Sequence, residues 1–138
     1  MKSNEKKSGI KTGLIINFLS LISTVVLFEY YRYIDDWKLL SIIAVSSALF
    51  VFLLSFYLVY GRTGAWRQTH RPFSKLDERE AGIFYESLRI AYSVFAILSL
   101  SILLVYAVGL WPVSIILFAA MLIIAHIMPA SVMLWKYK

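Results

Sequence analysis

The chain has no cysteine, which excludes disulfide bonds, thiolate nucleophiles, CxxC redox pairs and cysteine-ligated metal sites. Quinone-linked thiol oxidoreductases are therefore excluded as a class. Acidic residues are also scarce, since 8 Asp+Glu stand against 14 Lys+Arg among 138 residues. The sequence has no GxxxxGK[ST] segment, which excludes a P-loop nucleotide site. These absences remove thiol, disulfide and P-loop chemistry from consideration.

No acidic residue lies inside a long apolar run of the chain. Glu29 comes closest, but it lies at the far end of the first run, about 27 Å along a helix from Lys11. Small proton-coupled multidrug exporters are similar in size and helix number, yet they rely on a membrane-embedded glutamate that this chain does not have. Neither a Ser–His–Asp arrangement nor a pair of embedded carboxylates can be assembled. We therefore expect a protein that is not an enzyme.

Apolar residues, by contrast, are abundant: 60% of the chain is hydrophobic, against about 45–50% in soluble domains. A hydrocarbon core about 30 Å thick needs about 20 helical residues. The sequence predicts an all-α polytopic membrane protein, a four-transmembrane-helix bundle forming one domain over residues 1–138. Pro112 is expected in the first turn of the fourth helix. The expected parts are a tail at 1–9, spans at 10–31, 38–60, 89–108 and 112–135, and a loop with a helix extension at 61–88.

Basic residues predict the orientation of the four spans. The N-terminal tail, the second loop and the C-terminus share one side of the membrane. That side holds all the basic residues except Arg32 and Lys38, and the positive-inside rule makes it cytoplasmic. We therefore expect a multi-pass protein of the cytoplasmic (plasma) membrane, the cell inner membrane, with both termini inside. The basic residues on that side are Lys2, Lys6, Lys7, Lys11, Arg62, Arg67, Arg71, Lys75, Arg79, Arg89, Lys136 and Lys138.

The second loop is expected to begin as a turn and to end as a helix. Pro72 disfavours a helical conformation at the residue before it, so residues 67–73 are predicted to be extended. Ser74 starts a Ser-x-x-acid pattern, which is typical of a helix N-cap. A helix is therefore expected to begin at Lys75 and to continue without a break into the third span.

This loop also carries candidate binding residues. Arg67, His70 and Arg71, beside the aromatic side chain of Trp66, form a basic group suited to a lipid headgroup, a nucleotide phosphate or a partner's acidic tail. The alternative is a loop whose basic residues only set the topology of the chain. Their charge is then neutralised by the acidic residues that follow, Asp77, Glu78 and Glu80. Those acids occupy adjacent helical positions and point in different directions, so no metal site is expected.

Inside the spans, each predicted helix brings a polar residue to the cytoplasmic half, among them His126 and Asn17, the latter a candidate ligand- or partner-binding residue. His126 precedes Pro129, whose missing amide leaves the carbonyl of Ala125 without its helical donor. His126 is a candidate cofactor-binding residue, through a ligand pocket, a proton relay or axial ligation of a tetrapyrrole. The alternative is hydrogen bonding between helices, at about 0.6 kcal/mol per bond. Since the two histidines are expected in separate environments, no bis-histidine haem is predicted, and no cofactor is assigned.

The motif Trp66-Arg67-x-Thr69-His70-Arg71-x-Phe73-x-x-Leu76-Asp77-Glu78-Arg79, together with Ala125-His126-x-x-Pro129-Ala130, resembles a group of uncharacterised small four-helix integral membrane proteins of bacteria. The resemblance covers roughly the second half of the chain. It implies the four-helix architecture, and it implies no activity or ligand.

Two functions remain open on the sequence. The first is a non-enzymatic accessory or structural membrane protein that acts through helix–helix contacts with itself or a larger complex. The second is a small transporter or a lipid- or cofactor-binding bundle that uses the inner polar layer and the basic loop. The expected partners are the lipid bilayer, anionic headgroups and a membrane protein or a second copy. Nucleic acid is not expected, because so short a loop cannot supply a folded base-reading module.

Overall fold

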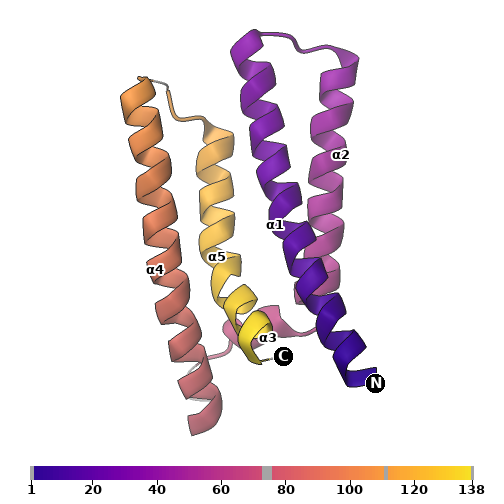
Figure 1. Cartoon of the computed structure of the whole chain (residues 1–138), viewed down its shortest axis with the longest axis vertical. Helices are drawn as coiled ribbons and strands as arrows, with labels where there is room; N and C mark the ends of the chain where they lie inside the picture. The colour runs from indigo at the N-terminus through magenta and orange to yellow at the C-terminus, as the bar shows by residue number, and fades with distance from the viewer. Residues whose placement is uncertain (1, 73–75, 111, 138) are drawn as a thin grey trace. The chain divides into compact units, whose positions relative to one another are not determined.

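The computed structural model describes residues 2–72, 76–110 and 112–137, with side chains from residue 7 onward. Every regular element in these ranges is a helix: α1 (Lys2–Ile34), α2 (Leu39–Phe56), the π-helical η1 (Tyr57–Gly61), α3 (Ala65–Thr69), α4 (Glu78–Gly109) and α5 (Ile115–Tyr137). The chain divides into two compact units, residues 1–63 and 64–138. In Figure 1 the first unit pairs α1 with α2, and the second pairs α4 with α5.

Four of these helices are long and apolar enough to cross a membrane. Their most apolar stretches have mean hydropathies from 1.9 to 2.5, and the shortest of the four segments has 23 residues. The prediction of an all-α chain with four such helices is confirmed. The helix α1 begins at Lys2 and continues into the apolar run, so it includes the residues of the predicted tail.

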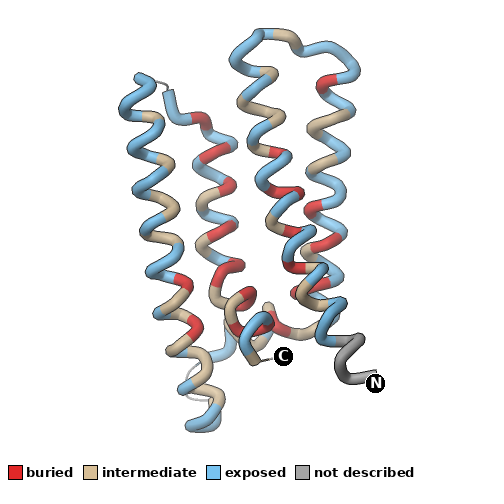
Figure 2. Tube along the Cα trace, in the orientation of Figure 1, coloured by how far each residue is buried: buried red, intermediate tan, exposed pale blue. Residues whose placement is uncertain are grey.

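The first unit is held by leucine and polar side chains along one stripe of α1. Its buried positions recur every three or four residues, as in a helix that packs along one face. Asn17 reaches across to α2, where its Nδ2 donates to the Ser55 hydroxyl at 2.9 Å and to the Phe52 carbonyl at 3.3 Å. The stripe consists of Leu14, Asn17, Ser20, Leu21 and Thr24 (Figure 2).

Close approach of the two backbones is concentrated near the N-terminal part of α1. A Cβ placed on Gly13 would lie 2.7 Å from Cγ2 of Val59, so only glycine fits there without a shift. Val59 belongs to η1, whose π-type geometry is seen in the bond from the Arg62 amide to the Tyr57 carbonyl at 3.1 Å. The α1–α2 hairpin is therefore a tight helix pair, as small residues at membrane-helix interfaces allow.

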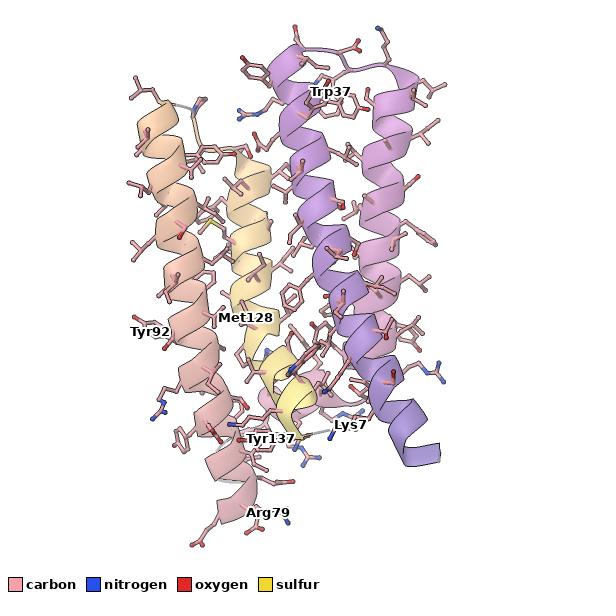
Figure 3. All side chains as sticks on the ribbon, in the orientation of Figure 1. Lys7, Trp37, Arg79, Tyr92, Met128 and Tyr137 are labelled. Atoms are coloured by element: carbon pink, nitrogen blue, oxygen red, sulfur yellow. The ribbon has the colours of Figure 1, made fainter. Side chains whose placement is uncertain are left out.

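At its other end the first unit turns between Ile34 and Leu39. Asp35 ends α1 in the left-handed region, with φ of 51°, and the Asp36 amide donates back to the Tyr31 carbonyl at 3.3 Å. This is the Schellman type of helix end. The ring of Trp37 then packs on Phe28 with centroids 5.3 Å apart, at the turn seen in Figure 3.

In the second unit, three local predictions are corrected by the structure. Residues 65–69 form the short helix α3 rather than extended chain, because Pro72 constrains only the residue immediately before it. The helix α4 begins at Glu78, and Asp77 is its N-cap, with a carboxylate that accepts from the Glu78 amide at 2.8 Å. Leu76 and Asp77 thus precede the helix, and the predicted N-cap Ser74 and start Lys75 lie outside the described residues.

The start of α5 is the third correction. Pro112 precedes the helix instead of occupying its first turn. Ser114 is the residue that caps it, because its hydroxyl accepts from the Leu117 amide at 2.9 Å and its carbonyl accepts from the Phe118 amide at 3.0 Å. A serine hydroxyl satisfies a free amide of the first turn, which the ring of proline cannot do.

Candidate functional site

The second unit contains an open surface hollow of about 260 Å³ that is lined by both histidines of the chain, and both of these residues are exposed. We call it the dihistidine cavity. Its wall is built by the end of α3, the first part of α4 and the middle of α5. The lining residues are Thr69, His70, Phe84, Leu88, Ala125, His126 and Pro129.

The imidazole of His70 is held in place by the short helix before it. His70 is the C-cap residue of α3, and its ring stacks on that of Trp66 with centroids 4.2 Å apart. Its Nδ1 lies 2.8 Å from the carbonyl oxygen of Trp66. A carbonyl only accepts, so this contact assigns the proton of the neutral ring to Nδ1 and leaves the lone pair on Nε2.

His126 is anchored in the same way on α5. Its Nδ1 lies 3.0 Å from the carbonyl oxygen of Leu122, one turn earlier, which again assigns the proton to Nδ1. Pro129 lies inside the helix, as the sequence indicates, and has no N–H to donate to the Ala125 carbonyl. The helix therefore lacks one backbone hydrogen-bond donor next to His126. Ala125 and Pro129 both line the cavity, so the missing donor lies at its wall.

The wall formed by α4 is apolar. Phe84 and Leu88 are one turn apart, which places both on the same face of the helix, and both are half-buried. The next residue, Arg89, is the last charged residue of α4 before its long uncharged stretch. The cavity therefore lies at the boundary between the polar and the apolar parts of the second unit.

A single carboxylate connects α4 to α5 by hydrogen bonds on the polar side of this boundary. Glu86 of α4 accepts hydrogen bonds from the Lys136 ammonium and the Tyr137 hydroxyl, both at the end of α5. Tyr137 is labelled at this position in Figure 3. The bonds from Lys136 and Tyr137 lower the pKa of Glu86, and the carboxylate in turn raises the pKa of Lys136 and of Tyr137. All three groups lie outside the uncharged stretches of α4 and α5 that are apolar enough to span a membrane.

These pKa shifts define the pH range in which the contact between α4 and α5 contributes to stability. Because the pKa of Glu86 is below its ordinary value of 4.5 in the folded protein, its contribution is present above pH 4.5 and is lost as pH falls through the folded value. The pKa of Lys136 lies above its ordinary 10.5, so its contribution is present below that pH and is lost as pH rises through the folded value. We expect hydrogen exchange at the last turn of α5, corrected for intrinsic rates, to rise about two- to fivefold on acidification below pH 4.5. Glu86→Gln should exchange at the higher level throughout, and an acid response retained in this variant would contradict the assignment.

The chemistry of the dihistidine cavity depends on the protonation of its two rings. In the neutral form each Nε2 is a hydrogen-bond acceptor or a metal ligand, and in the protonated form it is a cationic donor. A metal held by protein ligands alone is not indicated, because no group of three His, Cys, Asp or Glu suited to a metal occurs in the described part of the chain. The expectation of no metal site remains a prediction.

The structure brings together some of the residues singled out on the sequence and separates others. His70 and His126 line one cavity and Trp66 supports the first of them, whereas the sequence led us to expect the histidines in separate environments. Arg67 and Arg71 are exposed on α3 and just after it. Asn17 belongs to the first unit, where it is fully buried and bonded to α2.

Sequence reasoning did not place four of the lining residues in a site: Thr69, Phe84, Leu88 and Ala125. The one-turn spacing of Phe84 and Leu88 was visible, but it is equally typical of a helix face that meets lipid. No family model, curated protein or solved structure matches the chain. The candidate site therefore depends on its geometry alone.

Proposed function

We propose that the protein is a multi-pass integral membrane protein that binds a small ligand in the dihistidine cavity. One observation supports this most: two imidazoles from distant parts of the sequence line a single cavity, and each is oriented by an Nδ1 contact to a backbone carbonyl. Oriented imidazoles with an available Nε2 are the usual arrangement in ligand and metal sites. The function is thus the ligand-binding or transporting bundle, the second of the two that the sequence left open.

Membrane insertion and orientation are part of this proposal. Four apolar helices and the distribution of lysine and arginine support an N-in, C-in arrangement in the cytoplasmic membrane. The dihistidine cavity then opens toward the inner leaflet. We expect a reporter fused after Lys138 to behave as cytoplasmic and one inserted near Asp35 to behave as external. Cytoplasmic behaviour at residue 35 would contradict the orientation.

The ligand itself is accessible to native mass spectrometry of the protein purified in mild detergent. We expect the wild-type protein to retain a small-molecule mass. The triple variant Arg67→Ala, His70→Ala, Arg71→Ala should retain about tenfold less, because it removes one imidazole and the two adjacent positive charges. The matched control is Asp35→Ala, Asp36→Ala, Trp37→Ala in the first unit. Ligand loss in the control with retention in the first variant would overturn the proposal.

A second candidate, an accessory protein that works through helix–helix contacts, is favoured by the exposure of α4. Only 6% of the most apolar window of α4 is buried. In Figure 2 the trace of α4 is pale blue and tan over most of its length, with buried positions only in its first half. Such a face meets either lipid or another helix. In the same mass spectra, a second copy or a partner protein in place of a small molecule would favour this function.

A further inference from the structure

The dihistidine cavity can accept added protons at only two defined atoms. In each ring the Nδ1 proton is already directed at a backbone carbonyl, of Trp66 for His70 and of Leu122 for His126. A further proton must therefore go to Nε2, since that is the remaining basic nitrogen. Protonation leaves both anchoring contacts intact. It converts the two Nε2 atoms from hydrogen-bond acceptors into cationic donors.

The charges on the surrounding elements favour an anion once the rings are protonated. Apart from the histidines, no residue that lines the cavity is titratable. On the α3 side the charged neighbours are Arg67 and Arg71, both exposed. On α4, Glu80 and Tyr85 lie one turn from the lining residues Phe84 and Leu88. Glu86 and Arg89 follow on the same helix, and the carboxylate of Glu86 already accepts from Lys136 and Tyr137 of α5. On α5 itself, no charged residue precedes Lys136.

The size and lining of the cavity limit what enters it. A volume of about 260 Å³ is below the range for small-ligand sites, about 300–1,000 Å³. It suits a headgroup or a small ion rather than a whole lipid. Phe84, Leu88 and Pro129 provide apolar walls, which suit the carbon chain next to a charged group.

We propose that the ligand of the dihistidine cavity is a small oxyanion, a phosphodiester, and that its binding is coupled to proton uptake on Nε2 of His70 and His126. This inference rests on the proposed function, because it assigns the chemical class of the ligand of that same site. The oxyanion accepts from both Nε2–H groups, as charge-assisted hydrogen bonds do. The source of the anion is either a lipid headgroup at the membrane boundary or a free anion in solution.

Coupling between ligand binding and proton uptake predicts how strongly the association constant depends on pH. Linkage relates the association constant to the number of protons taken up on binding, and the range considered is pH 7 to 8. Each proton taken up on binding then raises the association constant about tenfold for every unit that the pH is lowered in this range. Two coupled histidines give up to about a hundredfold per unit, and one gives up to about tenfold.

The test is calorimetric titration of the full chain in phosphatidylcholine nanodiscs. The two probes are dihexanoylphosphatidylglycerol and dimethyl phosphate. Both are phosphodiesters that neither gain nor lose a proton between pH 6 and 8, so any proton uptake belongs to the protein. Comparing buffers of different ionisation enthalpy gives the number of protons taken up. Tighter binding of the first probe identifies a lipid headgroup as the source, and equal affinities identify a free anion.

We expect the wild-type protein to take up more than one proton at pH 7.5, each of His70→Gln and His126→Gln to take up one at most, and the double variant to take up none. Binding that is independent of pH, or proton uptake unchanged in the double variant, would overturn the coupling. Failure of both probes to bind at pH 6.5 would overturn the anionic class.

A cavity-filling variant, Ala125→Leu, separates these outcomes from the failure of the proposed function. If Ala125→Leu abolishes a pH-independent binding, the cavity is the site and only the proton coupling is wrong. If Ala125→Leu leaves binding unchanged, the ligand lies elsewhere and the proposed function fails together with the inference. If no probe binds, retention of a small molecule in the mass spectra decides the proposed function by itself.

Discussion

Ala125→Leu should lower the affinity for the ligand at least about tenfold, which corresponds to about 1.4 kcal/mol. Ala125 lines the dihistidine cavity on α5, next to His126. A leucine side chain there occupies volume that the ligand needs, while alanine and leucine are both good helix formers. The helix should therefore persist while the cavity is lost. The measurement is the association constant in nanodiscs, together with circular dichroism of the same sample.

The matched control is Ala119→Leu, the same substitution on the same helix. Ala119 is exposed and does not line the cavity, so affinity should change by less than about twofold. Equal losses of affinity in both variants would mean that a general perturbation of α5, rather than filling of the cavity, is responsible. That result would remove the steric argument for the site.

Gly13→Ala should destabilise the first unit, with a cost of about 1–3 kcal/mol from overpacking. The new Cβ would lie 2.7 Å from Cγ2 of Val59, well inside the ordinary contact distance of about 3.5–4.0 Å. Valine has one strongly preferred rotamer in a helix, so its side chain cannot rotate away cheaply. The better helix propensity of alanine offsets up to about 1 kcal/mol of the cost. Unfolding in mixed detergent micelles measures the net effect.

Two variants make this prediction specific to the contact. Gly9→Ala is the same change on the same helix, and because nothing lies within 4 Å of its Cβ, it should be neutral or stabilising. In a Val59→Ala background the clash is absent, so Gly13→Ala should become neutral or stabilising there as well. A destabilisation that persists in the Val59→Ala background would show that the Gly13–Val59 contact is not its cause.

The positions of the helices followed from the sequence, because length and hydropathy decide which segments can cross a hydrocarbon core. The ends of the helices were predicted less accurately from the sequence. Ser74 has the pattern of a cap, but the carboxylate of Asp77 caps α4. Pro112 is suited to a first turn, but Ser114 starts α5. Several residues near each boundary can satisfy the free amides, and the local pattern does not rank them.

The candidate site was visible on the sequence only as separate residues. His70, Trp66 and the arginines were recognised as a basic group, and His126 was recognised because it is ionisable within a span. Their meeting in one cavity was not predicted. His70 was expected in the loop and His126 within a span, in separate environments, whereas residues 65–69 form the helix α3, which contacts α5.

By itself, the sequence determined that this is an all-helical chain with four segments apolar enough to span a membrane, and that its charge is unequally distributed among the connections. These properties are sums over local residues, so no tertiary contact is needed to read them. Only the tertiary structure decided that Gly13 must be a glycine, that Glu86 joins α4 to α5, and that His70 and His126 share a cavity. Each of these depends on which faces of two helices meet, and helix rotation and register are set by packing between side chains far apart in the chain.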